Sequence, residues 1–146
     1  MSSVVRQRFM ERADELADCA SLTIESNVGA EWLRIVPHDY RALGVALYRL
    51  TGSGGYDAEI RHDHPGAIPL EEPSKASEVD YMVNLAVEGR LQVFVIGPRA
   101  AVTEELRDGK YRRKSHYGLR ATFRLPGWRR RAQRIAFMSY RTRTTT

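Results

Sequence analysis

Cysteine and long apolar runs are what this 146-residue sequence has least of. Its one cysteine, Cys19, excludes an intramolecular disulfide and a cysteine-based zinc cluster. No window approaches the roughly 18 apolar residues that a membrane-spanning helix requires. Arg6, Glu11 and Asp14 stand where a signal peptide would need uninterrupted apolar residues. We therefore expect a soluble, cytoplasmic protein that does not associate with membranes.

Acidic residues are also absent beyond Asp108. Residues 1–106 hold 10 Lys+Arg against 17 Asp+Glu, whereas residues 107–146 hold 13 Lys+Arg against Asp108 alone. Clustered cations raise the local potential and attract counter-charge, so this asymmetry predicts a polyanionic or acidic partner. All but three of the 23 cations are arginines, a skew that a GC-rich coding sequence would also produce. The disappearance of the acids therefore carries more weight than the abundance of arginine.

The chain length fits one domain that buries roughly 70% of its unfolded surface. No internal repeat or linker divides the sequence, so we predict a single domain over residues 1–146, with residues 141–146 forming a frayed tail. Apolar residues recur at three- and four-residue spacing over 3–20, which predicts an amphipathic helix. The same reasoning predicts a second helix over 39–52 and one helical turn over 103–107.

Alternating apolar residues predict the strands. Residues 22–25 and 32–36 form an expected hairpin around Asn27 and Gly29, residues 56–61 form a weak strand, and 63–76 form a long surface loop. Residues 79–87 fit a strand or a helix, and we favour a strand because Gly89 leads directly into the apolar run 91–96, which would make a tight hairpin.

Another expected hairpin joins residues 119–125 to 130–140 through Pro126 and Gly127, with Ala121, Phe123 and Leu125 facing inward and Arg120 and Arg124 outward. The predicted fold class is α+β, with two helices packed on one face of a mainly antiparallel sheet of five to seven strands built from local hairpins.

Motifs for catalysis and for metal or cofactor binding are weak. His62 and His64 project to one side of an extended chain, but a third ligand is missing locally, so we expect an exposed turn and no metal. The glycines at 52, 54 and 55 follow a predicted helix and lack the Lys-Ser/Thr ending of a phosphate-binding loop, so no cofactor is expected. Glu104 and Glu105 are adjacent in sequence, which predicts solvated carboxylates and not an acid–base pair.

The basic segment is the feature that points to a function, because it interleaves cations with aromatics. Guanidinium groups match phosphate oxygens bidentately, and aromatic rings stack on unpaired bases. No nucleic-acid-binding sequence pattern accompanies the segment, and an acidic protein surface or a second copy of this chain would suit the same charges. The candidate binding residues are Tyr111, Arg112, Arg113, Lys114, Tyr117, Arg120, Arg124, Trp128, Arg129, Arg130 and Arg131.

The leading hypothesis is a non-enzymatic binding protein that engages an acidic partner, either protein or nucleic acid, through an arginine-rich C-terminal hairpin. Self-association into a homo-oligomer is one form of the protein alternative. The second hypothesis is a small enzyme or ligand-binding α+β pocket in which His38, His62 or His64 acts as acid or base.

Overall fold

A computed structural model describes residues 2–50, 58–62, 68–71, 75–97, 100–118, 121 and 125–141 of the chain. The helices within these ranges are α1 (Ser2–Glu15), α2 (Ala76–Val87) and the short α4 (Trp128–Arg131). The strands are β1 (Ala20–Asn27), β2 (Ala30–Pro37), β3 (Val45–Leu50), β4 (Ala58–His62), β5 (Ile68–Glu71), β6 (Leu91–Gly97), β7 (Ala100–Arg107), β8 (Lys110–Tyr117) and β9 (Gln133–Ala136). No helix in the described ranges is long and apolar enough to cross a membrane.

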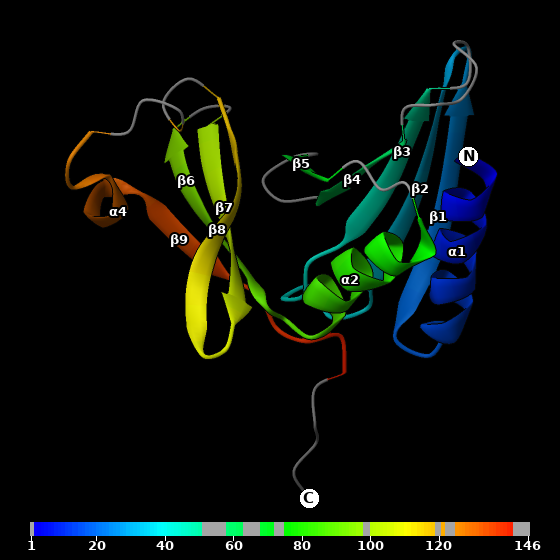
Figure 1. Cartoon of the computed structure of the whole chain (residues 1–146). Coiled ribbons are helices and arrows are strands. Elements are labelled where there is room, and N and C mark those ends of the chain that lie inside the picture. Colours follow the sequence, from blue (N-terminus) through cyan, green and yellow to red (C-terminus); the bar gives the residue numbers. More distant parts are fainter. Residues whose placement is uncertain are drawn as a thin grey trace, which may run out of the picture.

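Strands β1 to β5 form an antiparallel five-stranded sheet in sequence order. Helices α1 and α2 lie together on one face of this sheet (Figure 1). Every fourth residue of α1 from Val5 to Ala13 is buried, and the buried Leu33 and Ile35 alternate along β2, as the two periodicities require. The resulting main core includes Val5, Phe9, Ala13, Leu33, Ile35, Val45, Leu47, Val79, Met82 and Val83.

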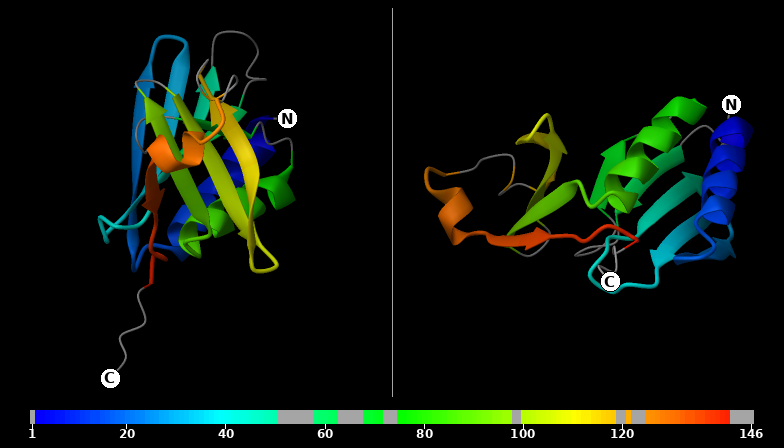
Figure 2. Two further views of the ribbon diagram at one scale, coloured as in Figure 1. Left: turned by 90° about the vertical axis from the view of Figure 1, so that its left-hand side faces the viewer. Right: turned by 90° about the horizontal axis from the view of Figure 1, so that it is seen from below.

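The remaining strands form a four-stranded antiparallel sheet in the order β8-β7-β6-β9. It stands beside the first sheet, and α4 covers the side that faces away from α1 and α2 (Figure 2). A small cluster of Phe94, Val102 and Ala121 lies under α4, and a second cluster of Val93 and Ala101 occupies the opposite side. The second sheet therefore has little apolar core of its own.

The chain after β9 returns to the main core. Met138 N–H donates to the Arg41 carbonyl at 3.0 Å, and the Tyr140 hydroxyl donates to the Leu43 carbonyl at 2.7 Å. Tyr140 is 4% exposed within the main core. Phe137 packs against both the main core and the Val93 cluster. This return ties the second sheet to the first.

The α+β class, the local hairpins and the two helices on one face of an antiparallel sheet are confirmed. The hairpin β1–β2 has the predicted turn, with Gly29 at φ +93°. The strands form two sheets and not one. Strands β1 to β5 form the first sheet, and β9 belongs to the second because it pairs with β6. The first helix ends at Glu15, before the predicted residue 20, and Cys19 follows it, buried at the start of β1.

The predicted helix over 39–52 is wrong, because residues 45–50 form β3 between β2 and β4. Val45, Ala46 and Leu47 are all fully buried, so both faces of this strand are covered. A strand buried on both faces loses the alternation that identifies strands, and its apolar residues then also satisfy helical spacing.

The strand favoured over residues 79–87 is also wrong, because this segment is α2. Val79, Met82, Val83 and Ala86 line its buried face. Gly89, at φ +66°, ends the helix: its N–H donates to the Ala86 carbonyl, and the N–H of the next residue donates to the carbonyl of Leu85. This is a Schellman motif in which Gly89 follows the C-cap residue Glu88, so the expected hairpin turn is instead the end of a helix.

The predicted helical turn over 103–107 is likewise wrong, and so is the predicted start of the last strand at residue 130. Residues 100–107 form β7, whose apolar residues pair with β6. The returning strand β9 pairs with β6, and α4 forms where that strand was expected to begin, while most of the other predicted strand, residues 119–125, lies outside the described residues. Leu125 is 67% exposed, whereas Ala121 is buried as expected. Arg120, Phe123 and Arg124 lie outside the described residues.

The predicted strand over 56–61 is present as β4. The predicted loop over 63–76 contains β5, whose Pro69 pairs with Arg61 at the edge of the first sheet. An edge strand tolerates proline because it need not donate to a further neighbour. The glycines at 52, 54 and 55, together with Asp63 and His64, lie outside the described residues.

Candidate basic binding surface

The hairpin β7–β8 presents most of the basic segment. Its two-residue turn consists of Asp108 at φ +53° and Gly109 at φ +77°. Positive φ at both positions is the geometry of a type I′ turn, whose twist matches that of the flanking strands. The turn therefore fixes the pairing of residues 110–113 with β7, and a bulge between Thr103 and Glu104 then shifts the register by one residue along β8.

The register divides the residues of β8 between the two faces of the sheet. Tyr111 pairs with Leu106, Arg113 with Glu104 and His116 with Val102, so these three lie on the face that α4 covers. Arg112 pairs with Glu105 on the opposite face. Tyr111, Arg113 and His116 are exposed. The basic segment thus supplies cations to both faces of the sheet.

Glu104 is a buried carboxylate on the face that α4 covers. It is 2% exposed, and the Gln92 side-chain amide donates to its Oε1 at 2.8 Å. Arg129 of α4 donates to both of its oxygens, with Nη1 at 3.4 Å from Oε1. The prediction that Glu104 and Glu105 are solvated is wrong, because Glu105 is also buried, at 6% exposed. Glu104 stands two residues after the apolar Val102 on β7, so the two side chains share one face. This spacing was the available sign that Glu104 faces inward.

Helix α4 holds Arg129 above this carboxylate. Gly127, at φ +79°, precedes the helix. Trp128 packs edge-on against Phe94 with ring centroids 5.5 Å apart, and the Arg129 guanidinium lies 5.0 Å from the Phe94 ring centroid. Trp128 therefore anchors α4 to the sheet, and it is less available for stacking on a ligand than the sequence suggested.

A further arginine extends the row of cations to the far strand of the sheet. Arg134 of β9 is exposed, and its Nε donates to the Gln92 Oε1 at 2.7 Å. Because Gln92 also donates to Glu104, one polar chain crosses three strands and orients two arginines. We use the term basic surface for the exposed cations and histidine that gather on this face: Arg113, His116, Arg129, Arg130, Arg131 and Arg134.

The basic surface has few compensating acids. Arg113 and Arg130 have no carboxylate within ion-pair distance among the described residues, and Arg131 donates only to the Pro126 carbonyl at 3.1 Å. The carboxylate of Glu104 is already occupied by Arg129. The surface therefore keeps a positive excess that can attract anions from solution.

On the opposite face of the sheet, side chains of β7 and β8 contact α2. Tyr81 donates a hydrogen bond to Glu105, and Arg107 Nη2 donates to the Tyr81 hydroxyl at 2.8 Å. The hydrogen bond to Tyr81 and the charge of Glu105 raise the pKa of Arg107. Lys114 lies 5.5 Å from the Tyr81 ring centroid. These contacts tie Arg107 and Lys114 to α2, and Lys110 and Arg112 are further exposed cations on this face.

No protein-family model, curated protein or solved structure matches the chain.

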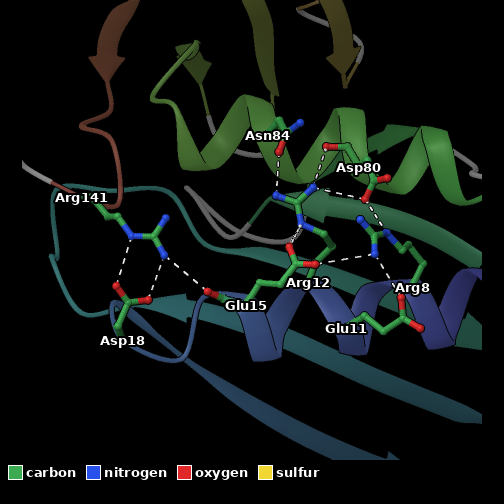
Figure 3. Close-up of polar contacts among 8 residues, drawn as sticks. All are labelled: Arg8, Glu11, Arg12, Glu15, Asp18, Asp80, Asn84 and Arg141. Carbon is green, nitrogen blue, oxygen red and sulfur yellow. Dashed lines mark hydrogen bonds and ion pairs between the residues drawn. The ribbon is translucent and has the colours of Figure 1, made fainter.

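Charged residues of the acidic half of the chain, residues 1–106, pair largely with one another. Arg8 and Arg12 extend from α1 to α2, where Arg8 Nε donates to Asp80 at 2.7 Å and Arg12 Nη2 donates to the Asn84 side chain at 2.6 Å (Figure 3). Burial raises the pKa of Asp80, but the hydrogen bonds from both arginines outweigh it and hold that pKa below its usual range. This cluster joins the two helices.

Three acid–base contacts link the acidic and basic halves of the chain within the described residues. Two are the Glu104–Arg129 and Glu105–Arg107 pairs on the second sheet. In the third, Arg141 Nη2 lies 2.9 Å from Asp18 (Figure 3), and these hydrogen bonds lower the pKa of Asp18. The two halves therefore neutralise each other only in part.

The structure brings some of the predicted binding residues together and separates others. Arg113 and the α4 residues Arg129, Arg130 and Arg131 share one face, whereas Arg112 and Lys114 belong to the other. Tyr117 lies at the end of β8, opposite Ala101. Sequence reasoning missed Arg134, because β9 was expected to pair with residues 119–125 and not with β6.

Of the histidines proposed as acid or base, His38 and His62 belong to the described residues. His38 follows β2, and its Nε2 lies 3.2 Å from the exposed Ser21 hydroxyl. The backbone of His62 lies on β4 opposite Val45. No group of three potential metal ligands occurs within the described ranges. Burial raises the pKa of the Cys19 thiol, which favours the unreactive protonated form.

Proposed function

We propose that this protein is a binding protein that engages an acidic macromolecule through the basic surface. The observation that carries the proposal is the gathering of exposed cations from β8, α4 and β9 on one face, around a single carboxylate that is already paired. Charges placed this way attract a polyanion over long range and contact several of its groups at once.

The buried contacts beneath the surface support a binding role. Glu104 and Gln92 hold Arg129 and Arg134 in fixed directions, so these guanidinium groups lose less conformational entropy when an anion binds. Arg113 and Arg130 have no competing carboxylate in the described part of the chain. Both features favour binding of a partner over simple solvation of the arginines.

Heparin, a generic polyanion, provides the test. The variant Arg113→Gln/Arg130→Gln/Arg131→Gln removes three exposed charges without touching the Glu104 contacts. A matched control, Arg41→Gln/Lys75→Gln/Arg141→Gln, removes three exposed charges elsewhere. The surface variant should elute from immobilised heparin at lower salt than the control, and the control should elute close to the unmodified protein.

Equal elution of the two variants would show that binding depends on net charge and not on this surface. Failure of the unmodified protein to be retained at low salt would contradict the proposal as a whole. Melting temperatures of all three proteins establish that each is folded in the comparison.

A further inference from the structure

We infer that the acidic macromolecule is a single-stranded nucleic acid that crosses the strands of the second sheet. The inference rests on the proposed function and adds the chemical class of the partner. It depends on three features of the basic surface: the line that the cations follow, the aromatic residue on the same face, and the small apolar area among them.

The cations follow a line across the sheet. Arg113 lies on β8, Arg129 lies above the carboxylate of β7, and Arg134 lies on β9 at the opposite edge. Neighbouring strands are about 4.8 Å apart, so the row spans roughly 14 Å from β8 to β9. Such a row suits a chain that carries a negative charge at regular intervals more closely than it suits one small anion.

An exposed aromatic residue lies on the same face as the row. Tyr111 is 39% exposed and pairs with Leu106, two positions along β8 from Arg113. A base adjacent to a bound phosphate can stack on such a ring, which requires that the base be unpaired. Duplex DNA offers no unpaired base, and its major groove accepts a helix, whereas α4 has only four residues and lies flat on the sheet.

An acidic protein surface fits less well. Protein interfaces bury an apolar or aromatic centre and keep charged residues at the rim. On the basic surface the centre is the Arg129–Glu104 pair, and the exposed apolar residue beside α4, Leu125, precedes the helix at its margin. Charge therefore dominates the middle of the surface.

Fluorescence anisotropy with labelled mixed-sequence oligonucleotides tests the inference on the full chain. The probes are single-stranded DNA, single-stranded RNA and duplex DNA of equal length, with polyglutamate as an unlabelled competitor. Both single strands should bind more tightly than the duplex, and polyglutamate should compete poorly. Tighter binding of RNA or of DNA then identifies which single strand is the source of the shared chemistry.

Substitutions at Tyr111 separate stacking from charge. Tyr111→Leu should weaken single-strand binding roughly tenfold, whereas Tyr111→Phe, which keeps the ring, should retain most of the affinity. Leu125→Ala should leave the affinity unchanged. Near-ultraviolet circular dichroism and melting temperature show whether each variant keeps the native fold.

The outcomes distinguish the two proposals. Equal binding of single strand, duplex and polyglutamate, all weakened by the surface variant, would overturn the inference and leave the proposed function standing. Loss of affinity in Leu125→Ala but not in Tyr111→Leu would favour an acidic protein and also overturn it. Absence of binding to every probe, together with no retention on heparin, would overturn both.

Discussion

Arg129 donates its hydrogen bonds to Glu104, a carboxylate that is 2% exposed on the second sheet. The pair is asymmetric, because the Arg129 side chain is 55% exposed. The exposed Arg129 thereby supplies hydrogen bonds to the buried Glu104 carboxylate, and Glu104 in turn holds the Arg129 guanidinium in position. The contact joins the stability of the second sheet to the geometry of the basic surface.

This asymmetry predicts a measurable coupling between the two residues. Glu104→Gln and Arg129→Gln should each destabilise the protein, and the double variant should be more stable than the sum of the single effects predicts. We expect a coupling free energy of about 0.5–3 kcal/mol from the urea unfolding of the four proteins. A coupling near zero would show that the pair is not formed in solution.

Packing in the main core predicts that substitution of Phe9 lowers the free energy of unfolding much more than substitution of the nearby Val4. Phe9 is fully buried between α1 and the first sheet, whereas Val4 on the same helix is 50% exposed. Phe9→Ala should lower the free energy of unfolding by about 3–5 kcal/mol, and Val4→Ala by no more than about 0.5 kcal/mol. Comparable losses of unfolding free energy at both positions would show that α1 does not pack on the sheet in the orientation described.

The end of α2 predicts a difference between two glycines. An added Cβ at Gly89 would lie 2.8 Å from the Ser139 nitrogen and 2.9 Å from the Phe137 oxygen, both backbone atoms, whereas at Gly29 it would meet nothing. Both glycines have positive φ, so each alanine variant carries backbone strain of about 1–2 kcal/mol. Gly89→Ala should cost a further 1–3 kcal/mol or so in overpacking. Equal thermal destabilisation would mean that residues 137–139 do not pack against this turn.

Protonation of Asp80 should account for part of the loss of folding stability in acid. Its folded-state pKa is depressed, because the hydrogen bonds from Arg8 and Arg12 outweigh the effect of burial. Its contribution to stability is therefore present above the ordinary carboxyl pKa and is lost as pH falls toward the folded-state value. Asp80→Asn should cost about 1 kcal/mol at neutral pH and show a shallower loss between about pH 5 and pH 3.

The control for Asp80 is Asp14→Asn, which removes an exposed carboxyl from α1 without touching α2. This variant should keep the acid profile of the unmodified protein in urea unfolding measured across pH. An unchanged profile in Asp80→Asn would contradict the ion-pair cluster between the helices.

The sequence alone predicts the local elements that have one buried side and one exposed side. The hairpin β1–β2 and helix α1 were predictable because each has one buried and one exposed side, so apolar residues repeat with the period of the element. Residues 45–50 and 79–87 were assigned to the wrong class because they are covered on more than one side. Periodicity separates a helix from a strand poorly where buried residues lie on more than one side of the element.

The candidate site was predictable only as a charge excess. Tertiary structure selects which cations share a face, and that selection depends on two non-local facts: β9 pairs with β6, and Arg129 reaches Glu104. Both depend on a strand order that local sequence does not encode. Arg134 was therefore missed, and Arg112 was grouped with residues of the opposite face.

The salt dependence of single-strand binding tests the central claim most directly. The logarithm of affinity should fall linearly with the logarithm of salt concentration, with a slope of about −0.7 for each phosphate contacted. Arg113→Gln/Arg130→Gln/Arg131→Gln should make that slope shallower by about 2, and Arg41→Gln/Lys75→Gln/Arg141→Gln should leave it unchanged. Identical slopes for the two triple variants would contradict the assignment of the basic surface as the binding site.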